Sequence, residues 1–260
     1  MIKAKKSLGQ NFLIDTNIIV KIVNLTNIRN RTVLEVGPGT GNLTKYILNK
    51  KPKKIYLIEK DNDLSILLKN NFNDQINIIN KDILEFDETT LSNERLVVFG
   101  NLPYNISTQI LSKWIIGLKN NPWFDYLILM FQKEVADRII AKFNTSDYGR
   151  LSILSNWRLK VEKICDIKPG SFSPKPKIDS SLLIFSPKDE FYKIKPKNLE
   201  KITRIFFNHR RKMLRKPFNQ IFNGNQNILN KLKIDLNLRP QNLDINTYFQ
   251  LTEEYENLMS

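Results

Sequence analysis

Residues 32–41 read Thr-Val-Leu-Glu-Val-Gly-Pro-Gly-Thr-Gly, a short apolar run that ends in three closely spaced glycines. A strand that ends in a Gly-rich turn brings backbone N–H groups and a helix N-terminus against a nucleotide-like cofactor. The Gly-x-Gly-x-Gly spacing differs from that of a dinucleotide site and suits a cofactor without a pyrophosphate, such as S-adenosylmethionine. A tight turn that binds no ligand is the alternative, because a lone Gly-rich turn is weak evidence.

Around this motif, strand-like runs alternate with helical patterns from about residue 32 to about residue 141. The alternation predicts a doubly wound α/β sheet. Ligands bind at the carboxyl ends of such strands, so residues just past those ends are expected to converge on one cleft. They are Gly37, Glu59, Asp82 and Asn101. The expected strands are 32–36, 54–59, 76–79, 96–99 and 126–131, and the expected helices include 63–72 and 106–118.

The composition favours a polyanionic partner. The 260 residues include 41 Lys and Arg against 26 Asp and Glu, a formal charge of +15, and 41% are hydrophobic. A globular protein with this excess of positive charge favours nucleic acid as a partner, although a merely Lys-rich composition would give the same charge.

Cysteine and histidine are almost absent from the sequence. Cys165 and His209 are single, so neither an intramolecular disulfide nor a Cys or His metal cluster is expected. No apolar run approaches the roughly 18 residues that a membrane-spanning helix needs. We therefore expect a cytoplasmic protein with metal-free chemistry and no membrane partner. We also expect a monomer.

Residues 101–104 read Asn-Leu-Pro-Tyr behind the apolar run 96–99. This sequence offers a carboxamide, a rigid turn and an aromatic face at a strand end, which suits chemistry on an exocyclic amine. An ordinary strand-terminating turn is the alternative, since Asn, Pro and Tyr all suit turns.

Six segments together resemble the KsgA and Erm rRNA adenine N6-dimethyltransferases, over nearly the whole chain. They are residues 6–13 (Lys-Ser-Leu-Gly-Gln-Asn-Phe-Leu), 35–41, 100–105, 148–152, 172–180 and 207–212. The resemblance implies a class I, Rossmann-like, S-adenosylmethionine-dependent methyltransferase sheet with a small C-terminal helical domain. Because the composition changes after Pro187, we expect a catalytic domain at 1–186 and a helical RNA- or ribosome-binding domain at 187–260.

The resemblance also implies a set of cofactor contacts. Asn11 and Leu13 would close over S-adenosylmethionine. Gly37 would approach its methionine part, Glu59 its ribose and Asp82 its adenine.

A second set of residues is implied for the target base. Asn101 would contact both ligands, and its carboxamide oxygen and the Leu102 carbonyl would accept hydrogen bonds from the adenine N6 amine. Tyr104 and, from the other side, Phe172 would stack on the flipped base. For Phe172, packing within a Pro-rich loop is the alternative to stacking.

The C-terminal part carries the expected RNA contacts. If residues 198–216 form one helix that Pro217 ends, five basic side chains share a face and His209 packs on the apolar side. These RNA-binding candidates are Lys201, Arg204, Arg211, Lys212 and Arg215. A solvated surface helix is the alternative.

Residues 207–212, 238–243 and 248–251 resemble KsgA rather than Erm. KsgA-type enzymes dimethylate two adjacent adenosines in a hairpin near the 3′ end of 16S rRNA, so the resemblance implies an immature small ribosomal subunit as partner. Two alternatives stay open: an Erm-type enzyme acting on large-subunit rRNA to confer macrolide resistance, and a non-catalytic ribosome-assembly factor on the same scaffold.

Overall fold

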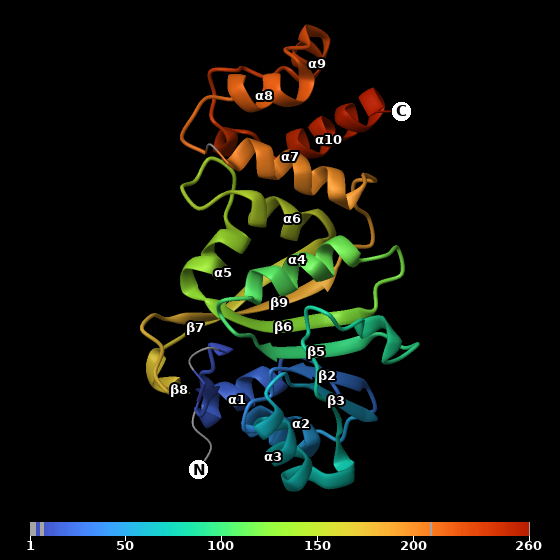
Figure 1. The fold of residues 1–260 in the computed structure, drawn as a ribbon, viewed down its shortest axis with the longest axis vertical. Coiled ribbons are helices and arrows are strands. Elements are labelled where there is room, and N and C mark those ends of the chain that lie inside the picture. Colours follow the sequence, from blue (N-terminus) through green and yellow to red (C-terminus); the bar gives the residue numbers. More distant parts are fainter. Residues whose placement is uncertain (1–3, 6–7, 209, 260) are drawn as a thin grey trace. The chain divides into compact units, whose positions relative to one another are not determined.

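The computed structural model describes residues 4–5, 8–208 and 210–259. The chain divides into two compact units (Figure 1). Unit 1 comprises Met1–Trp114, Leu118–Ala136 and Val161–Pro187; unit 2 comprises Ile115–Gly117, Asp137–Lys160 and Lys188–Ser260.

Unit 1 is built on a sheet that has seven strands in the described residues, in the order β4-β3-β2-β5-β6-β9-β7. Strands β4, β3, β2, β5 and β6 run parallel, and β9 pairs antiparallel with β6. The strands are β2 (Thr32–Val36), β3 (Lys54–Ile58), β4 (Asn77–Ile79), β5 (Leu96–Asn101), β6 (Phe124–Gln132), β7 (Leu159–Ile167) and β9 (Ser180–Pro187). The predicted parallel sheet is therefore confirmed, whereas the antiparallel direction of β9 was not predicted.

The sheet core follows from the apolar runs of the central strands. All five residues of β2 are buried, as expected for a strand covered on both faces. Val33, Leu57, Val97 and Phe99 are inaccessible to solvent, and Ile128 is 1% exposed. The α-helices up to residue 140 alternate with these strands. They are α1 (Thr16–Val23), α2 (Asn42–Asn49), α3 (Asn62–Phe72), α4 (Ser107–Gly117) and α5 (Lys133–Ile140). None of the helices among the described residues is long and apolar enough to cross a membrane.

A second, two-stranded sheet joins distant parts of unit 1. Strand β1 (Phe12–Leu13) pairs antiparallel with β8 (Phe172–Ser173). Just beyond β1, the backbone N–H of Ile14 donates to the carbonyl of Ser171 at 2.9 Å. The segment that precedes α1 is thereby fixed to the loop between β7 and β9.

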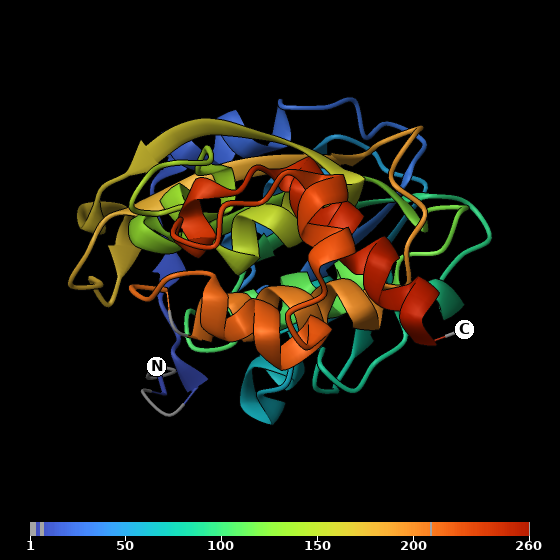
Figure 2. The ribbon, with the colours of Figure 1, turned by 90° about the horizontal axis from the view of Figure 1, so that it is seen from above.

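Unit 2 is built mainly of helices in its described residues. Its helices are α6 (Arg150–Arg158), α7 (Pro196–Asn208), α8 (Arg215–Phe222), α9 (Gln226–Leu232) and α10 (Ile245–Met259). Helices α7 and α10 lie side by side (Figure 2), and the ring of Phe206 meets that of Tyr248 edge-on at 5.7 Å. Residues 137–160, which the sequence assigned to the catalytic domain, fall in this unit, because α6 packs against α7 and α10.

The prediction of one helix over residues 198–216 is wrong. Helix α7 ends at Asn208, and α8 begins at Arg215. Pro217 therefore stands in the first turn of α8, where the N–H that proline lacks has no partner within the helix, so it starts a helix instead of ending one. His209, expected on the apolar side, lies outside the described residues.

Candidate active site

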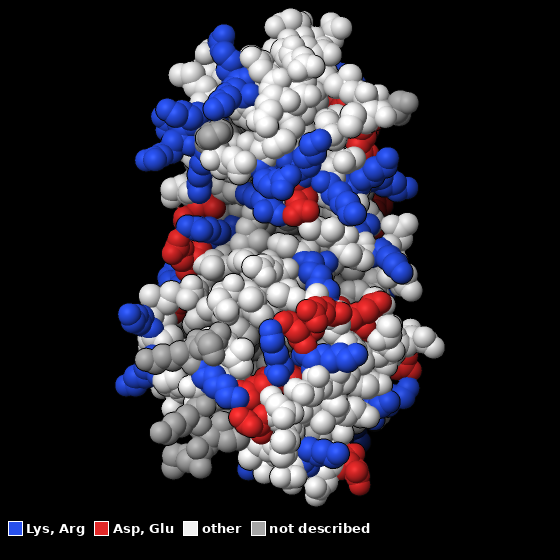
Figure 3. All heavy atoms as spheres, viewed as in Figure 1, with Lys and Arg blue, Asp and Glu red and all other residues white. Residues whose placement is uncertain are grey.

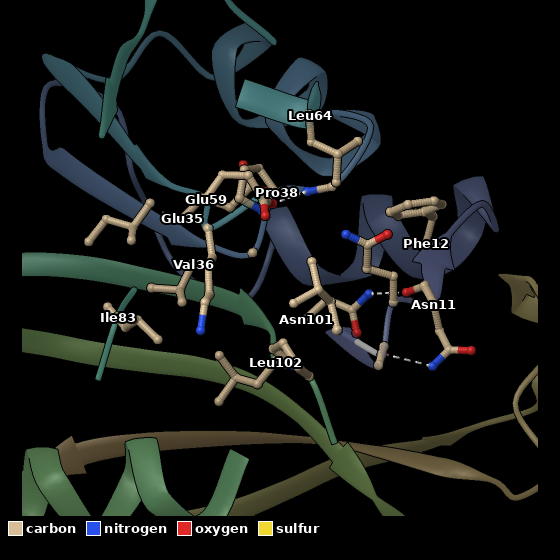
Figure 4. A pocket seen from close by; sticks show the side chains of 18 of the residues that line it. Asn11, Phe12, Glu35, Val36, Pro38, Glu59, Leu64, Ile83, Asn101 and Leu102 are labelled. Carbon is tan, nitrogen blue, oxygen red and sulfur yellow. Dashed lines mark hydrogen bonds between the residues drawn. The ribbon is translucent and has the colours of Figure 1, made fainter. Parts of the chain in front are cut away.

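A cavity of about 260 Å³ opens in unit 1 at the carboxyl ends of the parallel strands (Figure 4). Gly37, Glu59, Asp82 and Asn101 all line it, so the predicted convergence of the four strand ends is confirmed. Residues 8–13, which include β1 and the four residues before it, line the same cavity.

The Gly-rich loop approaches the N-terminal segment, the described residues before α1, so closely that a side chain at Gly39 would not fit. Gly37 and Gly39 have φ angles of +67° and +57°, in the left-handed region that favours glycine. A Cβ atom on Gly39 would lie 2.6 Å from Cδ1 of Phe12, and one on Gly37 would lie 3.4 Å from the carbonyl oxygen of Asn101. The loop therefore keeps a bare backbone against Phe12 at Gly39. At Gly37 only the φ angle favours glycine, because a Cβ atom there would make an ordinary contact with Asn101.

Glu59 is held at the end of β3 by backbone donors. One carboxylate oxygen accepts from the N–H of Gly39 at 3.3 Å, and the other accepts from the N–H of Asp61 at 2.9 Å. Burial raises the pKa of this carboxyl group, whose residue is only 7% exposed. Each oxygen retains a lone pair, so the group can accept hydrogen bonds from neighbouring hydroxyls of a ligand.

Asp82 follows β4 and lines the cavity beside Lys60. Its Oδ2 accepts from Nζ of Lys60 at 2.7 Å, and its Oδ1 accepts from the N–H of Leu84 at 2.9 Å. The hydrogen bond from Lys60 is the main reason why the pKa of Asp82 is lowered. The carboxylate is thus charged and fixed at the wall of the cavity.

Asn101 is joined to the N-terminal segment by a hydrogen bond. Nδ2 of Asn101 donates to the carbonyl of Asn11 at 2.7 Å, and Nδ2 of Asn11 donates to the carbonyl of Gly9 at 3.2 Å (Figure 4). The carbonyl of Leu13 in turn accepts from Nδ2 of Asn42 at 2.8 Å. Among the described residues nothing donates to the Asn101 Oδ1, so this oxygen is available as an acceptor.

The residues after Asn101 place one aromatic ring at the cavity. The Leu102 side chain is 1% exposed and anchors the turn. The Tyr104 hydroxyl lies 2.5 Å from the Ser180 hydroxyl, and burial raises its pKa. Tyr104 lines the cavity.

Phe172 differs from the sequence expectation. It is 1% exposed, packs in the core cluster that contains Leu13, and is not among the cavity residues. Its pairing in β8 with β1 explains this position, because the pairing directs the ring into the core of unit 1. In this structure Phe172 is a packing residue.

The basic candidates lie in unit 2 but do not share one helix face. Arg204 is exposed on α7, Arg211 and Lys212 are exposed between α7 and α8, and Arg215 is exposed at the start of α8. Figure 3 shows Lys and Arg side chains gathered over α7 and the segment before α8. Lys201 is engaged with α10 instead: its Nζ donates to the Tyr255 hydroxyl at 2.5 Å and lies 4.7 Å from the ring centre.

Sequence reasoning missed Asp61, which lies directly behind Glu59. Its side chain is 1% exposed and accepts hydrogen bonds from Lys5 and from Gln10. The available signal was its position, since an acidic residue that begins a helix two residues after Glu59 must lie near the same strand end.

Comparisons with known proteins agree with this geometry. The family model described as "Ribosomal RNA adenine dimethylase" matches residues 1–257. A protein of Pelagibacter ubique named "Ribosomal RNA small subunit methyltransferase A" is 67% identical over 258 residues, covering 99% of this chain and 98% of its own. A protein of Ehrlichia ruminantium with the same name is 43% identical, covering 95% of each chain.

Two solved structures share the fold. A crystal structure of a dimethyladenosine transferase from Plasmodium falciparum matches with a TM-score of 0.78 and 28% identity, covering 95% of this chain and 98% of the other. The 23S rRNA methyltransferase ErmE matches with a TM-score of 0.68 and 21% identity, covering 95% of this chain and 100% of the other. The class I methyltransferase sheet with C-terminal helices is therefore the fold of this chain.

Proposed function

This chain belongs to the ribosomal RNA adenine dimethylase family, and we propose that it transfers methyl groups from S-adenosylmethionine to the N6 amine of adenosines in small-subunit rRNA. The observation that carries the proposal is the Asn101 carboxamide. Its nitrogen is tied to the Asn11 carbonyl, and its oxygen is left as an acceptor in the same cavity as the Gly-rich loop.

The residues of the cavity fit S-adenosylmethionine. Gly37 lines the cavity and carries no side chain, so its backbone would allow close approach of the methionine part. Glu59 can accept from the ribose hydroxyls, and Asp82 can accept from the adenine amino group. Asn11 and Leu13 would cover the cofactor from the N-terminal side.

The bound cofactor supplies an activated methyl group on a sulfonium. The protein must therefore improve the nucleophile, because the adenine N6 lone pair is delocalised into the ring. Two acceptors, the Asn101 Oδ1 and the Leu102 carbonyl, would hold the amine out of its planar geometry and localise that lone pair toward the methyl carbon. This is stabilisation of the transition state by preorganised dipoles, combined with the gain from holding the reacting atoms in line.

The target base has to leave its stack to reach the cavity. Tyr104, whose hydroxyl is held by Ser180, offers a ring on which an extruded adenine can stack. Such a stack is worth roughly 1–3 kcal/mol per base. Since Phe172 is buried, we assign the stacking role to Tyr104 alone.

The substrate assignment draws on the relatives and on the C-terminal sequence. Relatives that cover nearly the whole chain carry the name ribosomal RNA small subunit methyltransferase A. Residues 207–212 and 238–243 also follow the KsgA pattern. We infer that the enzyme dimethylates two adjacent adenosines in the 3′-terminal hairpin of 16S rRNA within an immature small subunit, and that the C-terminal part 187–260 contacts the RNA.

Four exposed side chains of unit 2 are the proposed phosphate contacts: Arg204, Arg211, Lys212 and Arg215. Lys201 is a weaker candidate, because its ammonium group is already bound to Tyr255.

A particle-choice assay tests this function. Labelled S-adenosylmethionine is offered to small and large ribosomal subunits that lack their adenine methylations. We expect label in small-subunit rRNA only. Label in large-subunit rRNA alone would favour an Erm-type enzyme, and RNA binding without transfer to either particle would favour an assembly factor.

A further inference from the structure

Asp61 sits where two parts of the candidate active site meet. It is the residue before α3, and its side chain caps that helix by accepting from the N–H of Asp63 at 3.0 Å. Its own N–H donates to Glu59, the residue assigned to the ribose. Capping the helix accounts for the contact made by one carboxylate oxygen, Oδ1, but not for the role of the second oxygen, Oδ2.

The carboxylate of Asp61 also holds the N-terminal segment. Nε2 of Gln10 donates to its second oxygen, Oδ2, at 2.9 Å, and Nζ of Lys5 donates to Oδ1 at 2.7 Å. Gln10 is fixed in turn, because its Oε1 accepts from the N–H of Lys5 at 2.8 Å. Two hydrogen bonds thus tie residues 5 and 10 to a carboxylate that is 1% exposed, and a third ties these two residues to each other.

The contacts continue from Gln10 to the reacting end of the cavity. Asn11, the next residue, gives its carbonyl to Nδ2 of Asn101. The path runs from Glu59, which would bind the ribose, through Asp61 to Gln10. Because Gln10 and Asn11 are covalently joined, the path continues to Asn101, which would bind the target amine. All of these residues belong to unit 1.

We propose that Asp61 is a positioning residue that latches the N-terminal segment over bound S-adenosylmethionine and thereby fixes the Asn101 carboxamide. The proposal rests on the function proposed above. Closing the segment covers the cofactor, so the latch acts mainly on how slowly the cofactor leaves. Opening it would release both Gln10 and, through Asn11, the orientation of Asn101.

A reversal of one hydrogen bond tests the latch. In Asp61→Asn the amide oxygen still caps the helix, so the fold is retained. The amide N–H of the new side chain faces the N–H of Gln10, so the hydrogen bond to Gln10 is lost. Gln10→Glu sets two carboxylates against each other. The double variant restores one hydrogen bond with donor and acceptor exchanged, and the second oxygen of the carboxylate introduced at position 10 can still accept from Lys5.

The readout is the rate at which tritium-labelled S-adenosylmethionine dissociates from the full-length enzyme in a pulse-chase, beside the association rate and the melting temperature. We expect each single variant to release the cofactor about ten- to a hundredfold faster, the range that a hydrogen bond to a charged group is worth, with association changed by less than about twofold. The double variant should recover most of the slow release.

Asp63→Asn is the matched control. The Asp63 side chain also accepts from Lys5, at 2.8 Å, but it is 65% exposed, and Lys5 is its one side-chain partner among the described residues. Its release rate should therefore equal that of the unmodified chain.

The outcomes separate the two proposals. Unchanged release in Asp61→Asn, or a double variant that is no better than the single ones, would overturn the latch while the proposed function stands. Failure of the unmodified chain to bind labelled S-adenosylmethionine at all would overturn both.

Discussion

The carboxamide of Asn101 is assigned two tasks, and they can be separated by mutation. Asn101→Ala removes the acceptor for the target amine and also the hydrogen bond to the carbonyl of Asn11. Loss of one preorganised group of this kind typically costs about 10²–10³ in the rate of the chemical step. Loss of one ordinary hydrogen bond costs about 1 kcal/mol, which is less than tenfold in cofactor affinity.

Asn42→Ala is the matched control. It also removes a hydrogen bond from an asparagine Nδ2 to a carbonyl of the N-terminal segment, that of Leu13 at 2.8 Å, but it removes no acceptor assigned to the amine. We expect both variants to bind S-adenosylmethionine within about tenfold of the unmodified chain. Only Asn101→Ala should lose the further hundredfold or more in transfer.

The assay is single-turnover transfer of labelled methyl groups to unmethylated small subunits, beside equilibrium binding of the cofactor. A rate for Asn101→Ala within tenfold of the unmodified chain would refute the role of its carboxamide. An equally large fall in Asn42→Ala would refute it as well, because the whole effect would then come from the position of the segment.

Three further perturbations test other parts of the account. Tyr104→Ala should lose the stack of roughly 1–3 kcal/mol and slow methyl transfer at least about fivefold. Tyr104→Phe keeps the ring and loses only the contact with Ser180, so its transfer rate should stay close to that of the unmodified chain. Equal losses of rate in both variants would argue against stacking. Reversing the charges of Arg211 and Arg215 to Glu should weaken binding to small subunits and flatten its dependence on salt, measured by titration at several salt concentrations, and an unchanged slope would identify these side chains as solvated surface. Burial raises the pKa of Glu35 to about 8 from an ordinary value of 4.5, so the folded protein keeps a proton that the unfolded chain loses, and stability falls as pH rises between these values. Glu35→Gln should therefore gain free energy of unfolding relative to the unmodified chain from about pH 5 to about pH 8 in urea titrations; parallel pH curves for the two proteins would contradict the shift.

The parts of the fold that the sequence predicts are those with a strong local pattern. The strand expected at 32–36 is β2 to the residue, and that expected at 54–59 differs from β3 by one residue. Their apolar runs and the Gly-rich turn act over a few neighbouring residues, so the pattern is visible without tertiary information. The convergence of Gly37, Glu59 and Asn101 followed from the topology of parallel strands.

The parts that the sequence does not predict depend on distant contacts. Strands β1 and β8 have two residues each, too few for any periodicity. They exist because Phe12 pairs with Ser173, and Leu13 with Phe172, across more than half of the chain. That pairing also buries Phe172, which a local reading of its loop cannot foresee. Pro217 could equally end one helix or begin the next, and only the break after Asn208 decides between them.

We propose that the enzyme uses this cavity to methylate the N6 amine of adenosine in small-subunit rRNA. The most direct measurement is nucleoside mass spectrometry of 16S rRNA from unmethylated small subunits after incubation with the enzyme and isotopically labelled S-adenosylmethionine, with the product mapped to its nucleotides. We expect labelled N6,N6-dimethyladenosine at two adjacent positions in the 3′-terminal hairpin. Label on any other base or ring position, or none in an enzyme that binds the cofactor, would contradict it.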